Sequence, residues 1–377
     1  MTARKCPPLV DNDKSLQKLC SHLEGQPVIA FDAEMDSYYS YYTKLCLVQI
    51  STVEADWLVD PLVGLDLSVL NQATANAEQV KVFHAGENDI PYFKKFCGLE
   101  FVNVFDTHLA ARILALPTAS LAGLLSEFFE VELDKRFQRA DWRVRPLPPD
   151  QAEYARLDTR HLPELREILL ERLADEDRLE EARSECERIV HAEMREKEFD
   201  PDSWAKLKGV RELAADRRAV LRELYLWREQ KAQELDEASF RVAPDHFLFG
   251  LARKAPRNRD KLLAWARHGS ARRYTDELLD AINIGLDAGV IDLPLRKKGR
   301  KEDLTPRQQR AYNRLRSWRN EESEQRGVEP DRVATNRLLK AVARQLPANL
   351  DQLKKVDGME PWRLGMYGQP MLEQVKE

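Results

Sequence analysis

V-I-A-F-D-A-E-M-D-S, at residues 28–37, is the stretch of sequence that decides the fold. Four apolar residues, from Val28 to Phe31, predict a buried strand that ends in two acids, Asp32 and Glu34. Because side chains alternate along a strand, the two carboxylates point to the same side. They repel each other unless a cation lies between them, and oxygen ligands favour Mg²⁺ or Mn²⁺. Taken alone, D-x-E after an apolar run is common, and an acidic turn in which Asp32 caps a helix is then the better interpretation.

The composition sets limits on the class of protein. A chain of 377 residues is long for one domain and indicates two or three. The sequence has no apolar run near the ~20 residues that span a bilayer, and its first residues, M-T-A-R-K-C-P-P, lack the apolar region of a secretory signal. Five scattered cysteines without a C-x-x-C pair indicate a reducing cytoplasm, with neither a zinc site nor a disulfide framework. A net charge of −5 neither indicates nor excludes nucleic-acid binding, which needs only a local basic surface.

Further apolar runs of strand length alternate with helical patterns after the first motif. Strands are expected at residues 45–50, 57–59, 80–83 and 102–105, and helices at residues 15–23, 65–73, 106–114 and 121–129. Gln49, inside the second run, indicates a strand with one wetter face. Asp106 is expected near the N-terminus of its helix. This alternation indicates an α/β domain around a mixed sheet.

Two more acids stand in characteristic local contexts. In H-A-G-E-N-D-I-P-Y-F, residues 84–93, small residues allow a turn from strand to helix, and Asp89 falls near the helix N-terminus, where a carboxylate is favoured. Capping alone would explain Asp89, and a satisfied core histidine would explain His84. In Y-A-R-L-D, Tyr154 and Asp158 are four residues apart on a predicted helix and therefore share a face.

A basic and aromatic segment, D-K-R-F-Q-R-A-D-W-R-V-R-P-L at residues 134–147, precedes that helix. Its five basic residues are interleaved with Phe137 and Trp142. Cations that meet phosphates and rings that stack on bases suit single-stranded nucleic acid. A solvated loop held down by its aromatic residues is the alternative.

The motifs F-D-A-E, V-F-H-A-G-E-N-D and Y-A-R-L-D, in this order, resemble those of the DEDD 3′→5′ exonucleases of the tyrosine subgroup. The D-W-x-x-R-P-L pattern between the second and third motifs is similar to ribonuclease D. Met35 and Thr159 differ from the residues usual in the family, but neither change removes a ligand. The histidine subgroup would need histidine where this chain has Glu153. The resemblance implies a ribonuclease H-like exonuclease domain, a mixed sheet flanked by helices.

The resemblance also implies a mechanism. Four carboxylates, Asp32, Glu34, Asp89 and Asp158, would hold two divalent ions, Mg²⁺ or Mn²⁺, for hydrolysis of a phosphodiester bond. Asp32 would bridge the ions, Glu34 and Asp158 would complete one site, and Asp89 would serve the second largely through water. Tyr154 would orient the attacking water, because a phenol with a pKa near ~10 is a poor base at neutral pH. The expected substrate-binding residues are His84, Lys135, Arg139, Trp142 and Arg145.

The second half of the chain is helical in pattern and contains a repeat. L-Y-L-W-R-E at 224–229 matches L-R-S-W-R-N at 315–320, R-V-A-P-D at 241–245 matches R-V-A-T-N at 332–336, and A-R-K-A-P at 252–256 matches A-R-Q-L-P at 343–347. The constant spacing of 91 residues indicates a duplicated domain. Each copy resembles the all-α HRDC domain shared by RecQ-type helicases and ribonuclease D, with Trp227 and Trp318 in the core.

The expected domains are an exonuclease domain at 1–195 and HRDC domains at 210–293 and 303–377. The segment L-R-K-K-G-R-K-E at 295–302 forms the strongest basic patch of the sequence together with four arginines, Arg307, Arg310, Arg314 and Arg319. The hypothesis is that the second copy contacts RNA and that the first copy packs on the catalytic domain.

These features predict a cytoplasmic, monomeric 3′→5′ exoribonuclease that trims single-stranded 3′ ends, with transfer RNA precursors as the expected substrates and no membrane partner. A DNA-directed exonuclease is an alternative, since no motif visibly reads the 2′-hydroxyl group. A catalytically inactive RNA-binding adaptor is another, although four intact acids argue against it. A helicase is disfavoured because the sequence lacks a G-x-x-x-x-G-K-[ST] phosphate loop. The sequence leaves open which RNAs are processed, the extent of trimming and the choice between Mg²⁺ and Mn²⁺.

Overall fold

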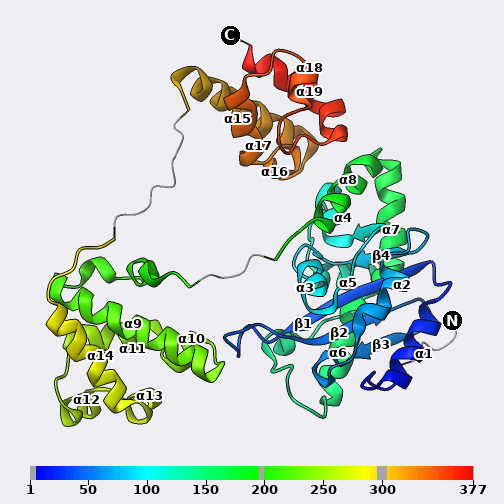
Figure 1. Ribbon diagram of the computed structural model, residues 1–377. Coiled ribbons are helices and arrows are strands. Elements are labelled where there is room, and N and C mark those ends of the chain that lie inside the picture. Colours follow the sequence, from blue (N-terminus) through cyan, green and yellow to red (C-terminus); the bar gives the residue numbers. More distant parts are fainter. Residues whose placement is uncertain (1–5, 195–198, 295–303, 377) are drawn as a thin grey trace. The chain divides into compact units, whose positions relative to one another are not determined.

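The computed structural model describes residues 6–194, 199–294 and 304–376 (Figure 1). For Lys135 it describes the backbone but not the side chain. These residues divide into two compact units. The first comprises Met1–Glu34, Leu45–Met194 and Glu302–Glu377, and the second comprises Met35–Lys44 and Arg195–Lys301. The first unit therefore joins the strands of the N-terminal half to the second helical copy, and the second unit contains the first helical copy.

A five-stranded mixed sheet is the centre of the first unit. Its strands are β1 Val28–Met35, β2 Leu45–Ser51, β3 Asp56–Val59, β4 Val80–Phe83 and β5 Val104–Asp106, in the order β3-β2-β1-β4-β5. β1 pairs in parallel with β4, β4 pairs in parallel with β5, and β2 pairs antiparallel with β3. The first motif therefore lies on the central strand, which agrees with its continuous apolar run.

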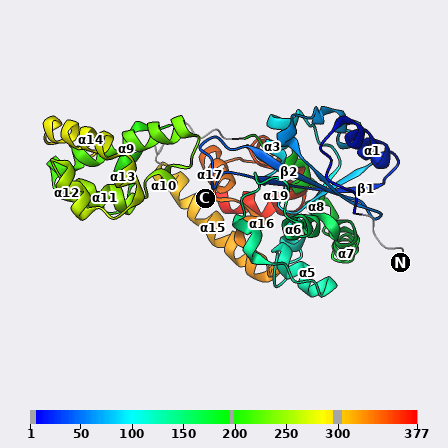
Figure 2. The same ribbon diagram turned by 90° about the horizontal axis from the view of Figure 1, so that it is seen from below.

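Eight α-helices surround this sheet among the described residues of the N-terminal half. They are α1 Asp13–Leu23, α2 Asn71–Thr74, α3 Ile90–Cys97, α4 Thr107–Ile113, α5 Leu121–Phe129, α6 Pro149–Arg160, α7 Leu162–Asp175 and α8 Leu179–Val190. The helix expected at residues 65–73 is a 3₁₀ turn, Leu67–Leu70, followed by the short α2. The 3₁₀ turn starts where the Asp66 carboxylate accepts a hydrogen bond from the Ser68 N–H group. Figure 2 shows α3 on one side of the strands and α6 to α8 on the other.

The two faces of β1 carry different side chains. Phe31 contacts the rings of Phe83, Phe93 and Phe101 on the side of α3, with ring centroids 5.7–6.3 Å apart. Ala30 lies on the opposite face, in a core with residues of α4 and α7. Since side chains alternate, Asp32 and Glu34 continue the Ala30 face.

The expected wetter face of β2 is absent, and that interpretation of Gln49 is wrong. Every residue of β2 is buried, and Gln49 has no exposed surface. Both amide atoms of Gln49 are buried without a hydrogen-bond partner among the described residues. Leu47 and Ser51 lie on the same face of the strand as Gln49. Leu47 shares a core with Ala155 of α6, and the Ser51 hydroxyl group lies 2.7 Å from that of Thr159, so the burial is caused by α6.

The first helical copy forms a core of its own in the second unit. Its helices are α9 Ala215–Leu235, α10 Ser239–Val242, α11 Asp245–Lys254, α12 Arg259–Trp265, α13 Gly269–Arg273 and α14 Thr275–Ala288. The loop between β1 and β2 belongs to the same unit. Ala238 N–H donates to the Tyr39 carbonyl at 2.9 Å, Tyr42 N–H donates to the Asp236 carboxylate at 3.0 Å, and the Tyr41 ring packs against the core.

The second helical copy repeats the first with the spacing seen in the sequence. Its helices are α15 Pro306–Arg326, α16 Pro330–Val333, α17 Asn336–Gln345, α18 Leu350–Leu353 and α19 Pro361–Val375. The bounds of α15, α16 and α17 are those of α9, α10 and α11 displaced by 91 residues. Arg228 donates to the Ala243 carbonyl and the Asp245 carboxylate, and Arg319 donates to the equivalent Ala334 carbonyl and the Asn336 side chain. The sequence repeat is therefore a duplicated structural unit.

These contacts correct part of the expected basic patch. Arg319 is 7% exposed and serves its own fold, and Arg314 donates from Nε to the Gln374 carbonyl at 2.7 Å. Arg307 and Arg310 lie on α15, and the segment 295–302 lies outside the described residues. The expectation for Trp227 and Trp318 is confirmed, since both pack against the cores of their copies.

The second helical copy packs on the catalytic part within the first unit. Its α19 contacts α8, and Arg112 of α4 pairs with Glu329 and Asp331 of the second copy. The hypothesis that the first copy packs on the catalytic domain stays a prediction. All five cysteines are free. Among the described residues, no helix is both long enough and apolar enough to span a bilayer.

Candidate active site

Three elements carry the four predicted acids. Asp32 and Glu34 lie near the end of the central strand β1, and Asp89 is the N-cap residue of α3, which follows β4. Asp158 lies on α6, one turn after Tyr154. The Asp89 side chain makes no capping hydrogen bond. Capping alone is therefore not the role of Asp89, and its carboxylate remains available for a ligand.

Mutual repulsion shows that these side chains face one another. Burial raises the pKa of Glu34 well above its ordinary value, and the negative charges of Asp32, Asp158 and Asp89 raise it further. Burial and the charge of Asp32 likewise raise the pKa of Asp158 and, together with Asp106, that of Asp89. Burial raises the pKa of Asp32 to about 7, although the N–H group of Ala33 opposes this shift. Asp32 is the one acid whose charge acts on all three others.

The donor set fits a hard divalent cation. The four acids form no ion pair with a lysine, arginine or histidine anywhere in the described ranges, and oxygen is the ligand that Mg²⁺ and Mn²⁺ prefer. Two of these carboxylates are buried and two are partly buried, and such carboxylates are costly when their charges act on one another without a positive partner. Within residues 6–194, 199–294 and 304–376, no three acid, histidine or cysteine side chains already stand in a metal-ligating arrangement.

Tyr154 faces the same acids. Burial raises the pKa of its phenol above the ordinary value, and the charges of Asp158, Glu34 and Asp32 raise it further. The phenol is therefore protonated at neutral pH and can donate a hydrogen bond. Its ring lies against Phe137 and Trp142, with centroids 5.5 and 6.1 Å away, which fixes its direction.

The turn that places Asp89 is held from β5. Ala85 has a φ of 61°, and a Cβ on Gly86 would lie 2.7 Å from Phe83, so this tight turn requires glycine there. The Asp106 carboxylate accepts hydrogen bonds from Gly86 N–H at 2.7 Å and Ala85 N–H at 3.3 Å, besides capping α4 through Leu109 N–H. The expected place of Asp106 at the N-terminus of its helix is confirmed. Its second role as a clamp on the turn was missed, because it depends on the parallel register of β4 and β5.

His84 lies partly buried beside this clamp. Its Nδ1 lies 2.9 Å from the Thr107 hydroxyl group, which itself donates to the Phe83 carbonyl. Burial and the neighbouring His108 lower the pKa of His84 to about 3, so the ring is neutral at physiological pH. These contacts agree with the core-histidine alternative, and a role in substrate binding stays a prediction.

Two of the predicted nucleic-acid contacts have structural partners instead. Trp142 is 2% exposed and packs with Cys46, Leu47 and Leu58, so its ring has no open face for a base. Arg145 donates to both oxygens of the buried Asp60, at 2.5 and 2.8 Å, and to the carbonyls of three residues, Cys46, Trp142 and Val144. The structure therefore speaks against direct contact of these two residues with substrate. A nucleic-acid surface and a loop held down by its aromatic residues both need aromatic and basic residues. Only tertiary contacts distinguish the two interpretations.

Arg139 lies on the short 3₁₀ helix Lys135–Arg139 and is exposed. The side chain of Lys135 lies outside the described residues. Both residues stay predicted contacts.

Comparison with known proteins places these features in a family. Residues 7–174 match the 3′–5′ exonuclease family, and residues 217–282 and 308–375 each match the HRDC domain. The chain is 29% identical to ribonuclease D of Pseudomonas paraeruginosa over 373 residues, 97% of each chain.

Solved structures agree with this match. The catalytic core of RRP6 from Trypanosoma brucei is 30% identical, with a TM-score of 0.70 over 76% of this chain and 81% of that one. RNase D of Escherichia coli, an exoribonuclease involved in structured RNA processing, is 25% identical, with a TM-score of 0.62 over 97% of this chain and 98% of that one. The chain spans about a third of the length of the exosome exonucleases that it also matches.

Proposed function

Since this chain belongs to the ribonuclease D family of 3′–5′ exonucleases with HRDC domains, we propose that it is a metal-dependent 3′–5′ exoribonuclease. It removes nucleotides from single-stranded RNA 3′ ends by hydrolysis. The observation that carries this proposal is the group of four carboxylates without a cationic partner, Asp32, Glu34, Asp89 and Asp158, with a protonated Tyr154 beside them.

Each residue has a defined task in this mechanism. The four carboxylates would hold two divalent ions, which would supply an acidified water nucleophile and charge stabilisation at the leaving 3′ oxygen. Asp32 holds the central position, because its charge acts on the other three acids. Glu34 and Asp158 would hold one ion, and Asp89 would hold the other. Tyr154 donates a hydrogen bond that orients the attacking water, and its raised pKa excludes it as the general base at neutral pH.

The proposed substrates are structured RNAs with short single-stranded 3′ ends, such as transfer RNA precursors. Support comes from the similarity, over nearly the whole chain, to an exoribonuclease involved in structured RNA processing. The protein is proposed to act as a cytoplasmic monomer. Its five free cysteines agree with a reducing compartment.

The test uses single-stranded RNA and DNA of one sequence, each labelled at the 5′ end. With Mg²⁺ or Mn²⁺, the purified chain is expected to shorten the RNA one nucleotide at a time from the 3′ end, and a chelator should stop the reaction. Asp158→Asn should lower the rate by at least about a hundredfold, the loss typical of removing a group that stabilises transition-state charge. Glu153→Gln is the matched control, because Glu153 lies on the same helix but is exposed and pairs with Arg160.

The same reactions separate the alternatives. Faster shortening of the DNA would favour a DNA-directed exonuclease. RNA binding without hydrolysis under any metal condition would favour an adaptor role and contradict the proposal.

A further inference from the structure

Two buried acids on α8 hold the second helical copy against the catalytic part of the first unit. Glu185 is 5% exposed and lies 3.1 Å from Nη2 of Arg363 and 3.6 Å from Nη1 of Arg332. One turn earlier, Glu181 accepts a hydrogen bond from Nη2 of Arg326 at 2.6 Å. All three arginines belong to the second copy and are largely buried. The interface is therefore ionic. The acids lie on α8, and the arginines lie on α15, α16 and α19 of the second copy.

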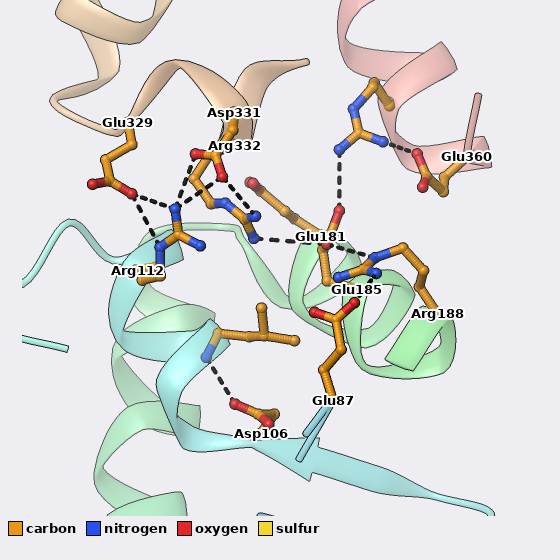
Figure 3. A network of polar contacts seen from close by, with 12 residues as sticks. Glu87, Asp106, Arg112, Glu181, Glu185, Arg188, Glu329, Asp331, Arg332 and Glu360 are labelled. Atoms are coloured by element: carbon orange, nitrogen blue, oxygen red, sulfur yellow. Dashed lines mark hydrogen bonds and ion pairs between the residues drawn. The ribbon is translucent and has the colours of Figure 1, made fainter. Parts of the chain in front are cut away.

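A second attachment lies on α4. The Arg112 guanidinium group donates to both oxygens of Asp331 at 3.0 Å and to Glu329 (Figure 3). Here the charges are reversed, with the arginine on the catalytic side. Together the two attachments fix both α4 and α8 against the second copy.

Helix α8 also reaches the turn that carries Asp89. Arg188 donates from Nε to Glu185 at 3.3 Å and from Nη1 to Glu87 at 3.0 Å, so it links the interface to a residue two positions before Asp89 (Figure 3). Cys186 accepts a hydrogen bond from Asp106 N–H at 3.3 Å, which ties α8 to the clamp on the same turn. The chain of contacts from the second copy to the turn is continuous.

The turn needs such support because part of it is exposed. Asp106 holds Ala85 and Gly86 from the inside, but Glu87 and Asn88 are exposed. Among the described residues, Arg188 is the side chain whose hydrogen bond holds Glu87. A catalytic group that is misplaced even slightly loses much of its effect on rate.

We propose that Arg188 is a positioning residue for Asp89, and that docking of the second helical copy through Glu185 sets how well Asp89 is placed. This inference rests on the proposed function for the role of Asp89. The face of the second copy that carries Arg332 and Arg363 then supports the placement of a catalytic residue, in addition to the predicted RNA contacts of this copy.

The test compares four full-length variants with the unaltered chain: Arg188→Ala, Arg188→Lys, Glu185→Gln and Arg337→Ala. Arg337→Ala is the matched control, because it removes an arginine from an exposed ion pair with Asp357 inside the second copy. The first readout is hydrolysis of a single-stranded RNA trinucleotide in Mn²⁺, too short to extend from the active site to a distant binding surface. The second readout is hydrogen exchange of the amides of residues 84–92 in metal-free protein, which needs no activity.

Arg188→Ala is expected to lower kcat on the trinucleotide by about two- to fivefold, the range that corresponds to one exposed ion pair, with KM unchanged. Glu185→Gln should lower kcat further, Arg188→Lys should restore part of it, and Arg337→Ala should have no effect. Hydrogen exchange at residues 84–92 should be faster than in the unaltered chain only in Arg188→Ala and Glu185→Gln.

Two results would overturn the inference. One is exchange at residues 84–92 that is the same in all variants. The other is a loss confined to long RNA with trinucleotide hydrolysis intact, which would make the second copy a binding surface only. Failure of the proposed function is distinguishable, because the unaltered chain would then not hydrolyse the trinucleotide at all, while the exchange measurement would still decide the positioning role.

Discussion

Replacing Glu185 with alanine is expected to destabilise the first unit strongly. The change leaves the guanidinium groups of Arg363 and Arg332 buried, with side chains 4% and 8% exposed, without their shared acid. Breaking a buried ion pair costs about 3–5 kcal/mol. Arg363 keeps its pair with Glu360 and its hydrogen bond to the Val333 carbonyl, so the lower end, about 3 kcal/mol, applies. The contact with Arg188 adds little, because that side chain is 40% exposed.

The assay is equilibrium unfolding of the full chain in urea, followed by tryptophan fluorescence. The free energy of the transition that includes the second copy should fall by about 3 kcal/mol, equivalent to about two orders of magnitude in its equilibrium constant. Glu180→Ala is the control on the same helix, because Glu180 is 78% exposed and lies 3.8 Å from Arg183. That change should cost less than about 1 kcal/mol.

The pH dependence of this loss has a defined sign. Burial alone would raise the pKa of Glu185, but the charges of Arg332 and Arg363 outweigh it and hold the pKa below the ordinary 4.5. An acid with a lowered pKa stabilises the fold above its unfolded value and loses that contribution as pH falls through its folded value. The difference between the unaltered chain and Glu185→Ala should therefore be full at pH 7 and shrink below pH 4.5. Equal free energies for Glu185→Ala and Glu180→Ala at pH 7 would refute the reasoning.

Three further outcomes follow from the site. In metal-free protein the pKa of Asp32 is raised from 3.8 to about 7, so a bound metal ion must displace a proton from Asp32 at pH 5 more often than at pH 7. The increase in Tm on adding Mn²⁺ should therefore be larger at pH 7 than at pH 5, and Asp32→Asn should weaken this trend. Gln49→Met removes a buried, unpaired amide and should raise the free energy of unfolding by about 1 kcal/mol in urea titrations, whereas destabilisation would mean that the amide has an essential partner. Tyr154→Phe should lower kcat by at least about tenfold without moving the pH–rate profile between pH 6 and 8, because an orienting phenol does not titrate there; a shifted profile would count for a base.

The positions of the four proposed catalytic acids in the fold could be predicted from sequence because their signals are local. The apolar run before Asp32 fixes a strand, and the alternation of side chains puts Glu34 on its side. The spacing of four places Tyr154 and Asp158 on one face of a helix. The repeat was equally readable, since helix bounds, the Arg228 and Arg319 contacts and the left-handed residues Ala255 and Leu346 all recur at 91 residues.

The remaining features depend on which elements meet in space. Trp142 and Arg145 are residue types that are common on nucleic-acid-binding surfaces. In the structure, however, Trp142 packs in a core with Ala155 of α6, and Arg145 donates a hydrogen bond to the buried Asp60. The interface on α8 had a weak signal in the sequence. Glu181 and Glu185 fall among Ala182, Cys186 and Ile189 on its buried face, where acids need a partner. That this partner is the second helical copy could be learned only from the tertiary structure.

The most direct test of the central claim is crystallographic. Crystals of the full chain soaked in Mn²⁺ and measured at the manganese absorption edge should show two anomalous peaks about 3.5–4 Å apart, in contact with Asp32, Glu34, Asp89 and Asp158. Crystals of Asp32→Asn treated in the same way should lose the bridged pair. Manganese bound at other residues, or no peak beside these carboxylates, would contradict the account.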